Sequence, residues 1–99
     1  MSLLSEASGD EIISERALSK LKWRCRRGLL ENDIFIERFF RRFELVLTVK
    51  QAQALGDLME LSDNDLLDLH LARKTLAQVE LDVDRSDTQE ILNMLRIPL

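Results

Sequence analysis

The chain has 99 residues, of which 45% are hydrophobic and 32% are charged, and its formal net charge is −4 at pH 7. This length and balance fit a single small folded domain with one core rather than a disordered segment. No apolar run approaches the roughly 20 residues that cross a bilayer, and residues 1–9 lack the pattern of a signal or transit peptide. One cysteine forms no intramolecular disulfide, so we expect a protein of the reducing cytoplasm.

The net charge conceals an uneven distribution along the chain. Residues 1–15 carry four acids, residues 16–42 carry nine bases and three acids, and residues 43–99 carry five bases and eleven acids. The three segments therefore have charges of −4, +6 and −6. A basic segment within an acidic protein predicts that a partner would meet a positive face.

The first half of the domain is predicted to hold two helices. Residues 1–9 are expected to be a flexible N-terminus, and residues 10–99 a single helical domain. A helix over 11–27 would take Asp10 as its N-cap and Gly28 as the left-handed residue at its end. A second helix, capped by Asn32 or Asp33, contains all four phenylalanines and is expected to dominate the core.

Further helices are predicted from capping signals. Thr48 to Gln51 has the capping-box form, and a Ser-Asp-Asn-Asp run at 62–65 opens a fourth helix. Gly56, inside the third helix, predicts the close approach of a neighbouring backbone. Residues 73–86 alternate apolar and acidic residues but have no strand to pair with, so we expect an extended connection. A last helix would open with a capping box at 87–90, which gives an all-α, small single-domain bundle of about five helices.

The sequence offers few residues that could act in catalysis. His70 lies in a leucine-rich stretch, where a structural role is favoured over a catalytic one. Cys25 lies among arginines that could activate a thiol, but no second cysteine or neighbouring histidine accompanies it. We interpret Cys25 as a small residue on the inner face of the first helix. The sequence contains no phosphate-cradling glycine loop and no cluster of metal ligands, so it predicts neither an enzyme nor a metal site.

The arginine-rich segment permits two interpretations. Basic and aromatic residues interleave in it as on a nucleic-acid-binding face: Trp23, Arg24, Arg26, Arg27, Phe35, Arg38, Phe39 and Arg41. The phenylalanines recur at core spacing, however, and the acidic protein as a whole disfavours phosphate backbones. Contact with another protein is therefore favoured. Trp23 is either part of that interface or a residue at the edge of the core.

A family resemblance arises at the boundary between the first two helices. Arg27 and Gly28, followed by Glu31, form an Arg-Gly-x-x-Glu signature, preceded by Arg26 and followed by Asp33. With its basic first helix and Ile/Phe-rich second helix, the chain resembles the SdhE-type succinate dehydrogenase assembly factors. The resemblance covers roughly residues 13–71.

The resemblance implies a small chaperone-like factor without catalytic residues of its own. Such factors bind the flavoprotein subunit of succinate dehydrogenase or fumarate reductase and promote covalent FAD attachment to it, which is protein flavinylation. We expect no stably bound cofactor, no nucleic acid, no membrane insertion and a monomer. The expected partner-binding residues are Trp23, Arg26, Arg27, Gly28, Glu31 and Asp33.

Two alternatives stay open at this point. Arg27 and Glu31 could pair with each other inside the domain and join the two helices, instead of contacting a partner. The chain could also be an arginine-rich regulatory or nucleic-acid-binding module, similar to an antitoxin.

Overall fold

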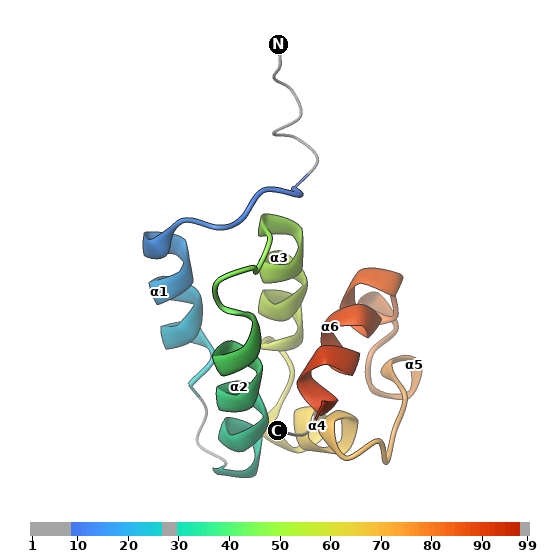
Figure 1. The fold of residues 1–99 in the computed structure, drawn as a ribbon. Helices are drawn as coiled ribbons and strands as arrows, with labels where there is room; N and C mark the ends of the chain where they lie inside the picture. The colour runs from blue at the N-terminus through green and yellow to red at the C-terminus, as the bar shows by residue number, and fades with distance from the viewer. Residues whose placement is uncertain (1–8, 27–29, 98–99) are drawn as a thin grey trace.

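Six α-helices and one 3₁₀ turn make up the part of the chain that the computed structural model describes, residues 9–26 and 30–97 (Figure 1). In chain order they are α1 (Glu15–Arg24), α2 (Leu30–Phe43), α3 (Val49–Leu58), α4 (Asp63–His70), α5 (Leu76–Val79), η2 (Leu81–Val83) and α6 (Ser86–Arg96). Helix α5 has four residues, whereas each of the other helices has eight or more. The prediction of an all-α domain with about five main helices is confirmed.

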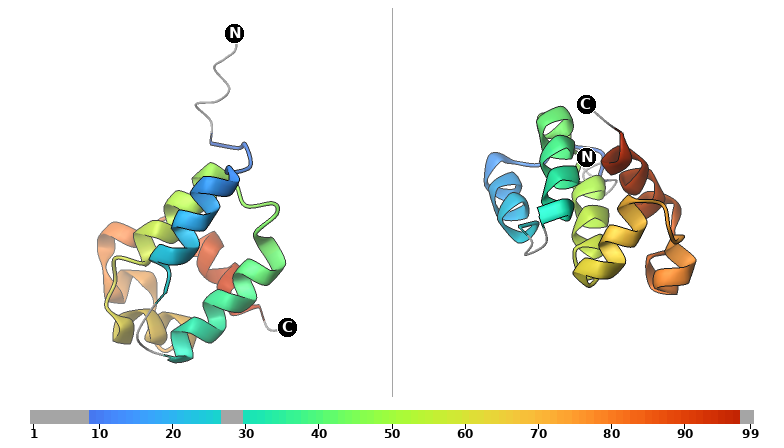
Figure 2. Two further views of the ribbon diagram at one scale, coloured as in Figure 1. Left: turned by 90° about the vertical axis from the view of Figure 1, so that its left-hand side faces the viewer. Right: turned by 90° about the horizontal axis from the view of Figure 1, so that it is seen from below.

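Helices α2, α3, α4 and α6 form most of the core, and α1 packs at its edge, where it contributes Leu21. The most extensive contact joins α3 to α6, while α2 packs on both α4 and α6. Helix α1 packs on α3 and lies alongside α2, as the two rotated views show (Figure 2). This leaves the side of α2 that faces α1 without a tightly packed backbone against it.

The aromatic part of the core comes from α2, as predicted. Phe39 and Phe40 are buried, and their rings meet edge to face with centroids 5.3 Å apart. Such a pair stabilises a core by about 0.5–1.5 kcal/mol beyond the area that it buries. The aliphatic remainder of the core comes mainly from the other helices: Leu21, Leu47, Leu55, Leu58, Leu66, Leu69, Leu76, Val83, Ile91, Leu92 and Leu95.

The two side chains considered for catalysis lie in the interior. His70 is buried, and its ring packs on Phe35 with centroids 4.6 Å apart. Cys25 is completely buried at the C-terminal end of α1. Both positions agree with the structural interpretation made from the sequence.

The first helix is shorter than predicted. Residues 9–13 are extended and pair antiparallel with residues 47–50, through backbone hydrogen bonds of 2.9–3.0 Å. The helix begins after Ser14, whose hydroxyl accepts a hydrogen bond as the N-cap. A helix over 11–27 capped by Asp10 is therefore wrong, because pairing with a distant segment keeps the backbone of residues 9–13 extended. The predicted end is wrong as well, since the helix ends at Arg24 with Cys25 as its C-cap.

The segment 73–86 was expected to be extended, and this prediction is wrong. It contains α5, which begins with a capping box between Thr75 and Gln78, and the 3₁₀ turn η2. The predicted capping box at 87–90 is wrong, because α6 already begins at Ser86. Its capping contact is the Arg85 N–H donating to the Thr88 hydroxyl oxygen at 3.3 Å. The buried Thr88 hydroxyl donates in turn to the Val83 carbonyl, so the 3₁₀ turn is bound directly to α6.

Gly56 is explained by a side chain and not by a neighbouring backbone. The Arg24 guanidinium crosses its surface, and an added Cβ would lie 2.9 Å from Nη1 of Arg24. Nη2 of Arg24 donates to the Gly56 carbonyl at 3.3 Å and to the Glu60 carboxylate at 2.5 Å. The glycine thus allows α1 to be joined to α3 through this arginine.

A different residue carries the backbone strain. Ala72, just after the C-cap of α4, has a φ of 59°, in the left-handed region that favours glycine. A residue with a Cβ loses about 1–2 kcal/mol of stability in this conformation. Glycine avoids that loss, but the greater flexibility of its unfolded chain offsets part of the gain. We expect Ala72→Gly to raise the free energy of unfolding by up to about 1 kcal/mol in urea titrations.

The matched control is Ala17→Gly, an exposed position within α1. It should lower the free energy of unfolding by about 0.5–1 kcal/mol, as glycine does in a helix. An equal loss in both variants would contradict the assignment of strain to Ala72.

Candidate partner-binding site

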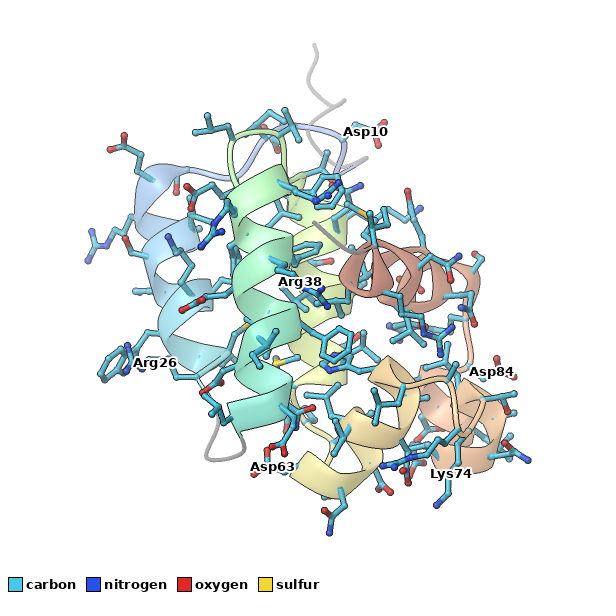
Figure 3. The ribbon with its side chains drawn as sticks, turned by 60° about the horizontal axis from the view of Figure 1, so that its bottom comes forward. Asp10, Arg26, Arg38, Asp63, Lys74 and Asp84 are labelled. Atoms are coloured by element: carbon cyan, nitrogen blue, oxygen red, sulfur yellow. The ribbon has the colours of Figure 1, made fainter. Side chains whose placement is uncertain are left out.

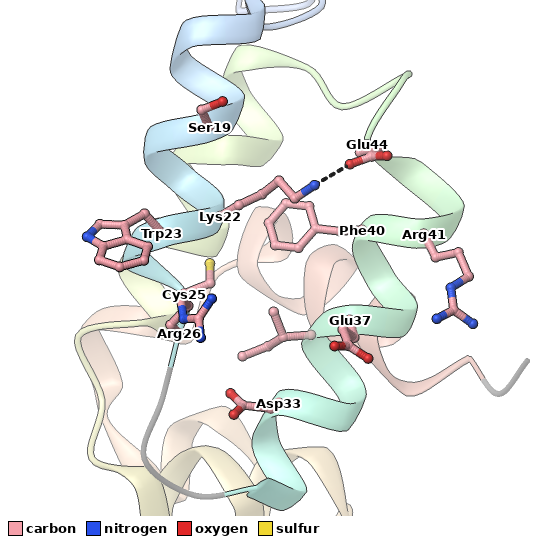
Figure 4. Close-up of a pocket in the computed structure, with 11 residues that line it drawn as sticks. Ser19, Lys22, Trp23, Cys25, Arg26, Asp33, Glu37, Phe40, Arg41 and Glu44 are labelled. Carbon is pink, nitrogen blue, oxygen red and sulfur yellow. Dashed lines mark hydrogen bonds and ion pairs between the residues drawn. The ribbon is translucent and has the colours of Figure 1, made fainter.

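A groove of about 740 Å³ opens between α1 and α2 (Figure 4). Its floor is apolar and consists of Cys25, Ile36 and Phe40, all of them buried. The groove exists because α1 packs on α3, so that only side chains bridge the distance from α1 to α2.

The walls of the groove are charged. Lys22 of α1 and Arg26, which follows that helix, contribute positive groups. From α2, Asp33, Glu37 and Arg41 contribute both signs. In Figure 4 the Asp33 side chain points from α2 toward α1. A charged wall above an apolar floor is the composition of a recognition surface, where a central apolar contact is surrounded by a polar rim.

One ion pair closes an end of the groove. The Lys22 ammonium lies 2.8 Å from the Glu44 carboxylate, and 5.8 Å from the centre of the Phe40 ring. Both side chains are partly exposed, so the pair adds at most about 1 kcal/mol to stability. It links the last turn of α1 to the C-terminal end of α2 over the floor.

Trp23 is a surface residue. Its side chain is 74% exposed, so the alternative of a core-edge position is wrong. The Arg26 guanidinium lies 5.4 Å from the centre of the indole ring, within the range of a cation–π contact. Together they form an exposed aromatic and cationic platform beside the groove.

The structure brings together part of the predicted site. Trp23, Arg26 and Asp33 line the same groove. Glu31 is exposed in the first turn of α2 and does not line it. Arg27 and Gly28 lie outside the described residues, together with the proposed turn and the alternative pairing of Arg27 with Glu31.

Sequence reasoning missed Glu37 and Arg41 as lining residues. Their signal was available, because Asp33, Glu37 and Arg41 follow one another at four-residue spacing and so share one face of a helix. These three residues lie next to the row of buried apolar residues on α2 that includes Ile36 and Phe40, and not on the opposite face of the helix. The spacing of the phenylalanines alone does not distinguish this charged row from the apolar row.

Asn32 holds the beginning of α2 in place. It is completely buried, and its Nδ2 donates to the Asp63 carbonyl at the start of α4, at 3.0 Å. Asp63 lies close to the first turn of α2 (Figure 3). The prediction that Asn32 or Asp33 caps α2 is wrong, because the helix already includes Leu30. The amide instead fixes the helix end that carries Glu31 and Asp33 against α4.

Several basic side chains within residues 9–26 and 30–97 are engaged by other groups of the domain. Arg24 is ion-paired with Glu60, and Lys22 is ion-paired with Glu44. The Arg38 guanidinium lies 4.8 Å from the centre of the Phe35 ring, on the far side of α2 from the groove residues (Figure 3).

Metal-binding clusters and membrane-spanning helices were sought in the part of the chain that the structure describes. Within 9–26 and 30–97, no three or more His, Cys, Asp or Glu side chains gather in a way that could hold a metal ion. None of the helices in that part of the chain is long and apolar enough to span a bilayer.

Comparison with known proteins gives one family. Residues 19–97 match the family model described as the flavinator of succinate dehydrogenase. A protein of Ralstonia nicotianae named FAD assembly factor SdhE is 50% identical over 78 residues, which are 79% of this chain and 79% of that protein.

Proteins of the same name are similar over shorter stretches. The one from Coxiella burnetii is 37% identical over 59 residues, or 60% of this chain and 72% of that protein. The one from Aliivibrio fischeri is 44% identical over 48 residues, or 48% of this chain and 56% of that protein. No solved structure matches the chain.

The Asn32 contact predicts a loss of stability on truncation. Asn32→Ala removes a buried hydrogen bond and leaves a small cavity, so we expect the free energy of unfolding to fall by about 1–3 kcal/mol. Asn64→Ala, at an exposed position in the first turn of α4, should change it by less than about 0.5 kcal/mol. Equal stability of the two variants in urea titrations would contradict the role of Asn32.

Proposed function

Because the chain belongs to the family described as the flavinator of succinate dehydrogenase, we propose that it is an assembly factor for a flavoprotein subunit. It binds the immature flavoprotein subunit of succinate dehydrogenase or fumarate reductase and promotes covalent attachment of FAD. The family match over residues 19–97 and the 50% identity to a FAD assembly factor support this proposal.

The strongest structural support for this proposal is the exposure of Trp23. A tryptophan that is 74% exposed leaves a large apolar surface in water, and a partner that covers it would gain most of the corresponding hydrophobic free energy. Tryptophan and arginine are also enriched among the residues that dominate binding energy at interfaces. The platform of Trp23 and Arg26 is therefore the proposed anchor of the complex.

The signature residues act beside this anchor. Arg27 presents a planar guanidinium that can bind a partner carboxylate or carbonyl in fork geometry. Gly28, which has no side chain, permits a close approach of the partner backbone. Glu31 and Asp33 supply acceptors for partner donors. The proposed binding set is thus Trp23, Arg26, Arg27, Gly28, Glu31 and Asp33.

The factor and the flavoprotein have different roles in the proposed reaction. The bond between FAD and the partner forms within the flavoprotein, so the factor needs no catalytic residue and no stably bound cofactor. Its contribution is to hold the flavin site in a geometry that favours bond formation, which lowers the entropic part of the barrier. The protein would act in the cytoplasm, where the partner subunit folds.

The proposal predicts separable effects on flavinylation and on folding. Glu31→Ala, Trp23→Ala and Gly28→Arg should each reduce covalent flavin on the partner subunit by at least about fivefold, because truncating or blocking an interface charge or anchor weakens binding. In-gel flavin fluorescence of that subunit, coexpressed with each variant, measures the effect. For the exposed residues Glu31 and Trp23, the thermal midpoint should change little.

Two variants serve as controls. Leu45→Ala removes a side chain that is 83% exposed in the turn between α2 and α3, and Glu90→Ala removes an exposed carboxylate on α6. Both should leave flavin fluorescence unchanged. Unchanged fluorescence in all three test variants would remove the proposed binding set from the mechanism. A marked fall in the thermal midpoint of Glu31→Ala would favour an internal role for that residue.

A further inference from the structure

One side of α1 is turned to the solvent and carries cations around a tryptophan. Arg16, Lys20 and Trp23 follow one another at spacings of four and three residues, so they share one side of the helix. All three are exposed, whereas the buried Leu21 lies on the other side. In Figure 4 the Trp23 ring points away from α2. We call Arg16, Lys20 and Trp23, together with the Arg26 that lies against the indole, the outer face of α1.

The cations of this face are not paired within the domain. Lys22 and Arg24, also in α1, each form an ion pair with a carboxylate of another segment. Arg16 and Lys20 form no ion pair with any residue of the ranges 9–26 and 30–97. Glu15 is the only acid in the sequence of α1, and it precedes Lys20 by more than one helical turn.

These side chains do not stabilise the helix that carries them. Arg16 lies in the first turn, where the helix dipole favours a negative charge and not a positive one. Arg16 and Lys20 are like charges at four-residue spacing, and such pairs repel. Trp23 leaves a large apolar surface in water. An acidic surface placed on this face would relieve the repulsion between the cations and cover the ring.

We propose that the outer face of α1 binds an acidic segment of the flavoprotein subunit. Carboxylates of that segment bind Arg16 and Lys20, while its backbone and apolar atoms cover Trp23 and the adjacent Arg26. Arg16 and Lys20 are then specificity-determining residues outside the Arg-Gly-x-x-Glu signature. The identity of the partner rests on the proposed function, whereas the sign of its charge follows from the cations of the face.

Charge favours an acidic protein segment over a nucleic acid. The protein has a formal net charge of −4, and residues 43–99 hold eleven of its eighteen acids. A long polyanion extends beyond a face of three cations and is repelled by the acidic remainder of the protein. A short acidic segment of a folded partner contacts this face alone. A second acidic partner surface without such a segment would gain nothing from Arg16 and Lys20.

Charge reversal on the outer face tests the proposal. Lys20→Glu should slow association with the purified flavoprotein subunit about fivefold in surface plasmon resonance at low salt, and Arg16→Glu combined with Lys20→Glu at least about 20-fold. The differences should largely disappear at high salt, because exposed charges are screened.

The same variants should not impair folding. Arg16→Glu places a negative charge in the first turn of α1, and Lys20→Glu places one four residues before Arg24, and both arrangements stabilise a helix. The thermal midpoint should therefore stay unchanged or rise. A slower association in these variants then reports a lost contact with the partner and not a damaged domain.

Lys50→Glu is the matched control, because it makes the same charge change at an exposed site in the first turn of α3. Its association rate should stay within about twofold of that of the unaltered protein. A double variant that associates no more slowly than Lys50→Glu would overturn this inference and leave the proposed function standing.

Two further results would also decide against the inference. The unaltered protein could bind a short single-stranded RNA at physiological salt, and the double variant could lose the RNA but keep its association with the subunit. The outer face would then belong to a nucleic acid. If the unaltered protein does not bind the subunit at all, the proposed function fails and this inference fails with it.

Discussion

The burial of Ile36, Phe39 and Phe40 fixes the rotation of α2 about its own axis, and the features of the groove depend on that rotation. Successive residues of a helix are about 100° apart, so a helix with its aromatic row in the core has only certain positions left at its edge. Asp33 and Glu37 occupy these edge positions on the side of α1. Packing of the interior thus decides which charges a partner meets.

The same helix is also held at its end. Asn32 donates to the Asp63 carbonyl from a completely buried position, which joins the first turn of α2 to the first turn of α4. On the other side, Arg24 crosses Gly56 and joins α1 to α3. Each helix that borders the groove is therefore fixed to a different part of the core. Their separation is a property of the scaffold and leaves the groove open between them.

Capping residues predicted the start of a helix correctly where the cap involves only neighbouring residues. Thr48 and Ser62 cap α3 and α4 as expected, because each hydroxyl accepts the backbone N–H three residues ahead and needs no other segment. The start of the first helix was misplaced because residues 9–13 pair with residues 47–50, a contact between segments far apart in the sequence. Short-range patterns contain no information about such a pairing.

The candidate site, too, could be predicted only in part from the sequence. The spacing of Asp33, Glu37 and Arg41 could have been recognised on a helical projection. The exposure of Trp23 could not, because an aromatic residue in an amphipathic helix suits a core edge and an interface equally well. In the connection 73–86, alternating apolar and acidic residues suggested extended structure, but the capping contact of Thr75 and the buried Thr88 favour helical turns there.

The proposed role in recognition and the empty catalytic inventory have a common physical basis. The groove offers an exposed ring, an apolar floor and charged walls, a combination that suits contact with a protein surface. His70 and Cys25, the two side chains with the most reactive chemistry, are both buried in the interior. A factor built in this way can hold a partner in one geometry while the partner's own groups form the covalent bond.

The central claim is that the groove beside Trp23 is where the flavoprotein subunit binds, and one NMR titration tests it most directly. The chain has a single tryptophan, so its ¹⁵N-labelled form gives one indole N–H resonance. Adding the unlabelled flavoprotein subunit should shift or broaden this resonance, while exposed amides of α6 away from the groove lose intensity only as the whole complex tumbles more slowly. An indole resonance that stays unshifted at saturation, with selective changes on α6 instead, would contradict the account.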